Sequence, residues 1–212
     1  RLAADDEVEY AVPDQRRRAL AVPNDPLYAG GAGLSPAAGQ WYLRAPDATR
    51  VSAINAVGAW GLTAGVAAGA GDMVVAVLDT GVLFDHPDLA ASLLPGQDFV
   101  ADAADARDGD GRDADASDPG DWTTTGQCGA GEAAAASSWH GSKMAGLIAA
   151  QADNGIGMAG VGRGVRVLPV RVLGACGGYD SDILAGMLWA GGVSANPVAN
   201  PHPARVINLS LG

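Results

Sequence analysis

Short, continuous apolar runs constrain the fold of this chain most strongly. They cover residues 73–78, 165–173, where two arginines interrupt the apolar residues, and 206–209, and Gly, Asp or Ser stands close to them. A run of this length without polar alternation is typical of a strand buried on both faces. None approaches the ~18–20 apolar residues of a membrane span, so no span is expected. The sequence therefore predicts three short apolar strands, of which the first two are buried.

Helical segments alternate with these strands. One helix is predicted over 141–151, and another from Asp180 or Ser181 to Trp189. A third, capped by Asp47 or Thr49 and closed by Gly61, has the apolar face Val51, Ile54, Val57 and Trp60. The alternation predicts an α/β fold in which a parallel β-sheet is flanked by helices.

Composition narrows the class of protein. With 48% hydrophobic and 17% charged residues among 212, the chain is globular and large enough for one sizeable core. Its net charge of −11 argues against nucleic acid and anionic membranes as partners, and it suits calcium as a ligand. Residues 23–40 and 96–121 are predicted loops, and a loop as long as the second is usually functional.

The candidate chemistry lies at the carboxyl ends of the strands. Asp79 and Ser210 follow two of the apolar runs, and His140 opens the helix over 141–151. Parallel sheets place their ligand crevice at these strand ends. A serine hydrolase needs a nucleophile, a base and a carboxylate that orients the base. Taken singly, the aspartate also fits a turn or cap residue, and the histidine a structural role.

The surrounding segments resemble those of subtilisin-like serine proteases. VVAVLDTGVLFDHPDL (74–89) is similar to the aspartate motif of that family, and WHGSKMAGLIAA (139–150) to its histidine motif. GMAGVGRGVRVLPVRVLG (157–174) resembles the following strand, and VINLSLG (206–212) the substrate-binding strand. The motifs occur in the family order of aspartate before histidine. The resemblance covers roughly 23–212 and implies a subtilisin-like catalytic domain that is incomplete at its C-terminus.

The resemblance implies roles for particular residues. Asp79 would orient His140, which would act as general base for a serine in a downstream Gly-Thr-Ser-Met-Ala motif. That serine and the oxyanion-hole asparagine are not in these 212 residues, so this chain alone is expected to be inactive. The family places Ser210 in a cleft wall and not at the nucleophile. The expected substrate walls are Ser210, Leu211 and Gly212 on one side and Gly177 and Gly178 on the other, although the two glycines also fit a plain turn.

Two residues depart from the family's histidine motif. Ser142 and Lys143 stand where Thr and His are usual. Serine keeps the hydroxyl, whereas a cation beside the imidazole would disfavour its protonated form. Lys143, the only lysine, fits the site best if it points to solvent.

A calcium site is implied by the resemblance to bacterial and kexin-like subtilases. Asn24-Asp25-Pro26 and Gln40-Trp41-Tyr42-Leu43 are similar to their mature N-terminus, with 29–39 as an insertion between the two parts. The implied oxygen ligands are Asp25, Asp88 and Asn154, with carbonyls near Ile156 and Met158. The alternative for Asp88 is a helix cap.

A second acidic cluster follows at 108–122. Its candidate calcium ligands are Asp108, Asp110, Asp113, Asp115 and Asp121. Carboxylates so closely spaced repel one another without a counter-ion. The alternative is a solvated acidic loop, because no bidentate glutamate follows at the spacing of a calcium loop.

The two cysteines, Cys128 and Cys176, fit either a disulfide or two buried thiols. Secreted bacterial subtilases carry cysteines at similar places, so the resemblance implies the bridge. It also implies a secreted protein that is extracellular, or periplasmic in transit.

The segment 8–26 resembles the end of an inhibitory propeptide running into a mature enzyme. Residues 1–22 are then a propeptide remnant and linker, and 23–212 the N-terminal part of the catalytic domain. Cleavage is expected between about residues 18 and 24. The implied partners are protein or peptide substrates, the protein's own propeptide and the C-terminal remainder of the domain.

Two other functions compete with this hypothesis. An aspartic protease shares the Asp-Thr-Gly of Asp79, but it needs two such carboxylates and hence a dimer here. A catalytically inactive, calcium-stabilised homologue would have the same motifs without turnover. Asp79 and His140 are both present, which argues against this second alternative.

Overall fold

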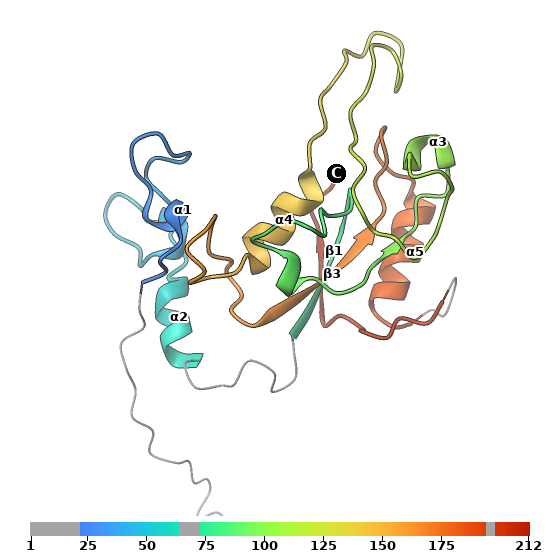
Figure 1. Ribbon diagram of the computed structural model, residues 1–212. Coiled ribbons are helices and arrows are strands. Elements are labelled where there is room, and N and C mark those ends of the chain that lie inside the picture. The colour runs from blue at the N-terminus through green and yellow to red at the C-terminus, as the bar shows by residue number, and fades with distance from the viewer. Residues whose placement is uncertain (1–21, 64–72, 194–197) are drawn as a thin grey trace, which may run out of the picture.

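Four parallel strands form the sheet at the centre of the molecule (Figure 1). The computed structural model describes residues 22–63, 73–193 and 198–212, so the predicted propeptide remnant lies almost entirely outside the described residues. The strands are β1 (Met73–Asp79), β2 (Gln97–Asp98), β3 (Val165–Arg171) and β4 (Val206–Leu209), in the order β2-β3-β1-β4. In the register of β1 and β3, Asp79 pairs with Arg171.

The helices are mostly short. They are α1 (Pro26–Ala29), α2 (Ala56–Thr63), α3 (Ala103–Ala106), α4 (His140–Ala149) and α5 (Asp180–Ala190), with 3-10 turns at Trp41–Leu43 and Ala90–Ser92. No helix among the described residues is long and apolar enough to cross a membrane.

Helices α4 and α5 cover opposite faces of the sheet (Figure 1). Ala145 and Ala149 of α4 pack with Val77 and Val167, whereas Trp189 of α5 packs with side chains of the other face, including Leu78. Continuous apolar strands are required because both faces are buried. The predicted α/β fold and the three predicted strands are confirmed.

A separate small core holds the N-terminal segment. Tyr28, Leu43, Ala56 and Trp60 pack with Ala159, outside the two clusters on the sheet. The backbone N–H of Leu27 donates to the carbonyl of Gly157, 2.9 Å away. The segment around α1 is thus tied to the loop that follows α4.

The predicted start of the first helix is wrong. The helix begins at Ala56 and contains Gly61, whereas the Asp47 carboxylate accepts the N–H groups of Thr49 and Arg50 in a local turn. Val51 is 76% exposed and therefore faces no core. A short polar side chain can close a turn as readily as it caps a helix, and here the turn prevails.

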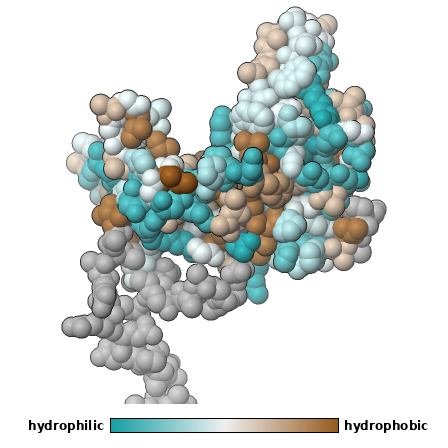
Figure 2. Space-filling view, in the orientation of Figure 1, coloured by the Kyte–Doolittle hydropathy of each residue, from teal (hydrophilic) through white to brown (hydrophobic). Residues whose placement is uncertain are grey.

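The stretch 121–138 rises above the sheet as a long arm (Figure 1). Thr123 and Ala135 pair near its base, and Cys128 is joined to Cys176 in a disulfide, as expected. On the face of the molecule drawn in Figure 2, strongly hydrophobic residues gather in the middle, and few lie on the arm. We infer that the backbone pairing and the disulfide hold the arm, because it contributes nothing to the apolar clusters.

Candidate functional site

The last residue of β1 supplies a rigid carboxylate. Asp79 is 1% exposed, and its carbonyl accepts the N–H of Val172, 2.9 Å away. One carboxylate oxygen accepts the N–H of Thr80 at 2.8 Å. The strand and the turn after it therefore fix both the backbone and the side chain.

His140 begins α4 and faces this carboxylate. Its Nδ1 lies 2.9 Å from each oxygen of Asp79, and its backbone N–H donates to Ser138 Oγ at 3.2 Å. Trp139, at the N-cap, has a φ of 52°, a left-handed conformation that is uncommon for a bulky residue. With Nδ1 bound to the carboxylate, Nε2 is the ring nitrogen left for an incoming group.

The predicted substrate walls line one cleft. Its volume is about 620 Å³, and its lining includes His140, Gly177 and Gly178, and residues 210–212. The other lining residues are Thr80, Asp121, Ser138, Leu173, Cys176, Asp180 and Ile183. Ser210 Oγ accepts a hydrogen bond from Asn208 Nδ2 at 2.8 Å.

The two departures within α4 lie away from the imidazole. Ser142 Oγ accepts the N–H of Leu83 at 2.9 Å and so helps to dock the helix on the turn after β1. Lys143 is exposed and borders a separate small hollow with Trp139 and His86.

Several polar residues around the pair were not predicted. Thr80 Oγ1 donates to Asp118 at 2.7 Å, and it accepts the N–H of Gly141 at 3.1 Å. Asp121, predicted as a calcium ligand, instead accepts Ser138 N–H at 2.5 Å and Ser138 Oγ at 2.7 Å. In a loop rich in aspartate, the only sequence signal for Asp118 is the Asp-Pro-Gly turn that it opens.

The structure brings the first set of calcium candidates together. Asp25 accepts the N–H groups of Asp153 and Asn154 at 2.9 and 3.3 Å. Asp88 accepts Asn154 Nδ2 and Met158 N–H, both at 2.8 Å. Both carboxylates are buried, and neither forms an ion pair within the part of the chain that the structure describes.

This donor set fits a hard cation. Buried carboxylates are normally paired or coordinate a metal, and no cationic side chain pairs with these two among residues 22–63, 73–193 and 198–212. The same described ranges hold no group of three or more His, Cys, Asp and Glu side chains placed for a metal. Calcium here would therefore rely on the Asn154 amide and on backbone carbonyls as well as on Asp25 and Asp88.

Among the described residues, the carboxylates of the second predicted calcium cluster are engaged separately and are not gathered at one point. Asp108 forms an ion pair with Arg171 at 2.5 Å. Asp113 and Asp115 close local turns by accepting the N–H groups of Asp115 and Ser117, and Asp110 is exposed. Arg171 and the backbone N–H groups supply the positive charge for which the sequence suggested a metal.

Arg171 also binds a buried aspartate. It lies 2.5 Å from Asp98, which no solvent reaches, and its other terminal nitrogen donates to the carbonyl of Ala106. Burial raises the pKa of Asp98 to about 7, although the N–H of Val100 and the guanidinium oppose this.

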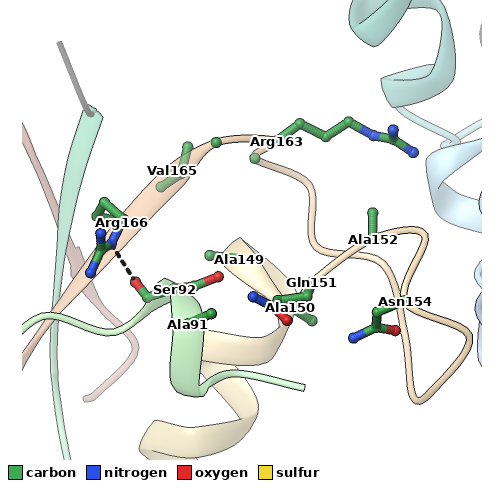
Figure 3. A pocket seen from close by; sticks show the side chains of 12 residues that line it. Ala91, Ser92, Ala149, Ala150, Gln151, Ala152, Asn154, Arg163, Val165 and Arg166 are labelled. Atoms are coloured by element: carbon green, nitrogen blue, oxygen red, sulfur yellow. Dashed lines mark hydrogen bonds between the residues drawn. The ribbon is translucent and has the colours of Figure 1, made fainter. Parts of the chain in front are cut away.

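A second hollow, of about 670 Å³, lies where α4 ends and β3 begins (Figure 3). Arg166 reaches across to the carbonyl of Ser92, whereas the Arg163 side chain extends away from the hollow (Figure 3). Neither Asp79 nor His140 lines it. The candidate chemistry thus belongs to the cleft at the strand ends.

Comparisons with known proteins agree with this geometry. The model of the subtilase family matches residues 70–212. An extracellular protease of Xanthomonas campestris pv. campestris is 45% identical over 212 residues, and an extracellular basic protease of Dichelobacter nodosus is 43% identical over 216. Each alignment covers 100% of this chain and 33% of the relative, so the chain spans about a third of these curated relatives.

A solved protease structure from Pseudoalteromonas arctica PAMC 21717 has a similar fold. The TM-score is 0.76 at 44% sequence identity, and the match covers 90% of this chain and 51% of the other. The subtilisin-like fold inferred from the motifs is therefore confirmed.

Proposed function

Because the chain belongs to the subtilase family, we propose that Asp79 and His140 serve a serine endopeptidase. The observation that carries the proposal is the contact between them. A buried carboxylate at a strand end meets Nδ1 of a cleft-lining histidine through both of its oxygens, at 2.9 Å. That arrangement fixes the imidazole tautomer and stabilises an imidazolium.

The proposed reaction uses a serine in the remainder of the catalytic domain. As its Oγ attacks the peptide carbonyl carbon, the hydroxyl proton passes to Nε2 of His140. Asp79 stabilises the resulting imidazolium. The C–N bond then breaks as His140 returns the proton to the leaving amine, and a water molecule hydrolyses the acyl-enzyme by the same route.

The cleft walls suggest how substrate would bind. An extended peptide between Gly177–Gly178 and 210–212 would add a strand through main-chain hydrogen bonds. We further propose secretion, since two relatives are extracellular proteases, and an inhibitory role for the segment that precedes the domain. Ca²⁺ at Asp25, Asp88 and Asn154, with carbonyls near Ile156 and Met158, would stabilise the N-terminal segment.

The test uses the full-length protein that contains this chain. We expect a fluorophosphonate to label it, and His140→Ala to lower kcat by about 10⁶-fold and Asp79→Asn by about 10⁴-fold, as in other triads of this kind. His202→Ala, outside the cleft, is the matched control and retains activity. Full turnover in His140→Ala would exclude the proposed role.

Residues 1–212 by themselves are expected to show no peptidase activity. Turnover by this piece that Ser210→Ala abolishes would instead identify Ser210 as a nucleophile.

A further inference from the structure

A buried carboxylate outside the Asp79–His140 contact is connected to both of its members. Asp118 is 5% exposed and lies in the segment that pairs with the turn after β1: its N–H donates to the carbonyl of Val82 at 3.0 Å. Its own carboxylate accepts two hydrogen bonds, from Thr80 Oγ1 at 2.7 Å and from the N–H of Gly120 at 2.8 Å.

The Thr80 hydroxyl connects this carboxylate to the catalytic candidates. Its single proton goes to Asp118, which leaves its lone pairs for the N–H of Gly141 at 3.1 Å. Gly141 directly follows His140 in α4. The backbone N–H of the same threonine donates to Asp79 at 2.8 Å. One residue thus contacts the carboxylate of the pair and the first turn of the helix that carries the imidazole.

We propose that Asp118 is a positioning residue, which holds Asp79 and His140 in register by fixing the orientation of the Thr80 hydroxyl. This inference rests on the proposed function. Without an acceptor at Asp118, the hydroxyl would be free to turn its proton elsewhere. The N–H of Gly141 would then lose its directed partner at the start of α4, where helix N–H groups lack partners within the helix.

The two hydrogen bonds that Asp118 accepts stabilise its buried carboxylate. Burial raises the pKa of Asp118, while the hydrogen bonds from Thr80 and Gly120 lower it. The other charged groups that act on it are Asp121, which raises the pKa further, and Arg171, which lowers it. A buried charge is tolerated only when it is paired or hydrogen-bonded, so Asp118 depends on Thr80 as much as Thr80 depends on Asp118.

The decisive variants change one atom group each. Asp118→Asn replaces one of the two acceptor oxygens by a donor, so either Thr80 or Gly120 loses its partner. Thr80→Val removes the hydroxyl and nearly keeps the shape, and Thr80→Ser restores the hydroxyl. The matched control is Asp182→Asn, an equally buried aspartate on α5 that binds Arg112 and does not line the cleft.

The experiment measures kcat and KM of the full-length protein, together with the folded fraction of each variant. We expect Asp118→Asn and Thr80→Val to lower kcat by roughly 10- to 100-fold with KM changed less than threefold, the scale of a displacement of about 1 Å at the reacting groups. Thr80→Ser and Asp182→Asn should remain near wild type in kcat. The low-field proton resonance of the His140–Asp79 hydrogen bond should move in the first two variants and not in the last two.

Three results would overturn the inference. They are an unchanged kcat in both Asp118→Asn and Thr80→Val, an equal loss in Asp182→Asn, or a loss explained wholly by a smaller folded fraction. Failure of the proposed function itself would give a different result. In that case the His140→Ala variant would retain the turnover of the wild type.

Discussion

At the level of single residues, three buried aspartates of this chain have distinct partners. Asp79 binds the imidazole of His140, Asp98 binds Arg171, and Asp118 binds a hydroxyl and a backbone N–H. The partner is therefore what distinguishes the three carboxylates, and it is the basis on which we propose different roles for them.

The pKa of Asp98 has a consequence for stability. Its folded pKa of about 7 lies above the ordinary aspartate pKa of 3.8, so the folded state holds this proton more tightly than the unfolded state. The stabilisation from that proton is present at low pH and is lost as the pH rises from about 4 through about 7. Between pH 6 and 8 the loss amounts to about 1 kcal/mol.

Asp98→Asn cannot ionise, so it should not lose this stability between pH 6 and pH 8. We therefore expect the free energy of unfolding of Asp98→Asn, relative to that of the wild type, to rise by about the same amount over this pH range. Denaturant unfolding at the two pH values measures the difference. Asp110→Asn, at an exposed position in the segment that follows β2, controls for the change in charge. An identical pH dependence in wild type and Asp98→Asn would contradict the shift.

At the level of elements, α4 is docked on the turn after β1 through its first residues. A Cβ built on Gly141 would lie 2.1 Å from the carbonyl oxygen of Gly81 and 3.2 Å from the Cβ of Asp79. The helix can thus approach the strand end only because this position is glycine. That approach places His140 within hydrogen-bond distance of Asp79.

Gly141→Ala tests this docking. Because backbone atoms cannot give way as a flexible side chain does, we expect destabilisation by roughly 1–3 kcal/mol and a marked loss of kcat. Gly146→Ala is a matched control on the same helix, since its Cβ would meet only Met158 Sδ at 3.7 Å. This variant should gain up to about 1 kcal/mol from helix propensity. Equal behaviour of the two variants would show that the close contact is unimportant.

The strands with short apolar runs could be predicted from the sequence. The features that depend on polar contacts could not. The apolar runs predicted β1, β3 and β4 to within two residues, because apolar side chains pack on both faces of the central strands. The two-residue strand β2 consists of Gln97 and Asp98, so no hydrophobic pattern in the sequence predicts it. Likewise, the Asp79–His140 pair followed from motifs, whereas Asp118 depends on a contact between segments 38 residues apart.

At the level of the whole molecule, polar contacts and the small apolar core join the N-terminal segment to the loop after α4. Asp25 binds the N–H groups of 153 and 154, and Asp88 binds Asn154 and Met158. A cation bound there would link three stretches that are distant in sequence. The loss of such a cation would loosen the whole small core around Tyr28 and Trp60.

Chelation should therefore lower the Tm of the calcium-loaded full-length protein. A ligand at about 100 times its Kd contributes about 2.7 kcal/mol, which corresponds to roughly 5–10 °C for a domain of this size. Asp88→Asn should abolish the response to EDTA, and Asp113→Asn, from the acidic loop, should retain it. An unchanged Tm in excess EDTA, measured by calorimetry, would exclude the site.

The position of β4 affects how this polypeptide behaves at high concentration. Among the described residues it pairs along one side only, with β1, and Val206 is 50% exposed while Leu209 is 39% exposed. An apolar edge strand of this kind is a template for any extended segment, including the same strand of a second molecule. The net charge of −11 opposes such contacts by long-range repulsion, which salt screens. Association of residues 1–212 in solution thus depends on two opposing effects, pairing through the exposed edge of β4 and repulsion between negatively charged copies. Low ionic strength strengthens the repulsion and so favours the monomer.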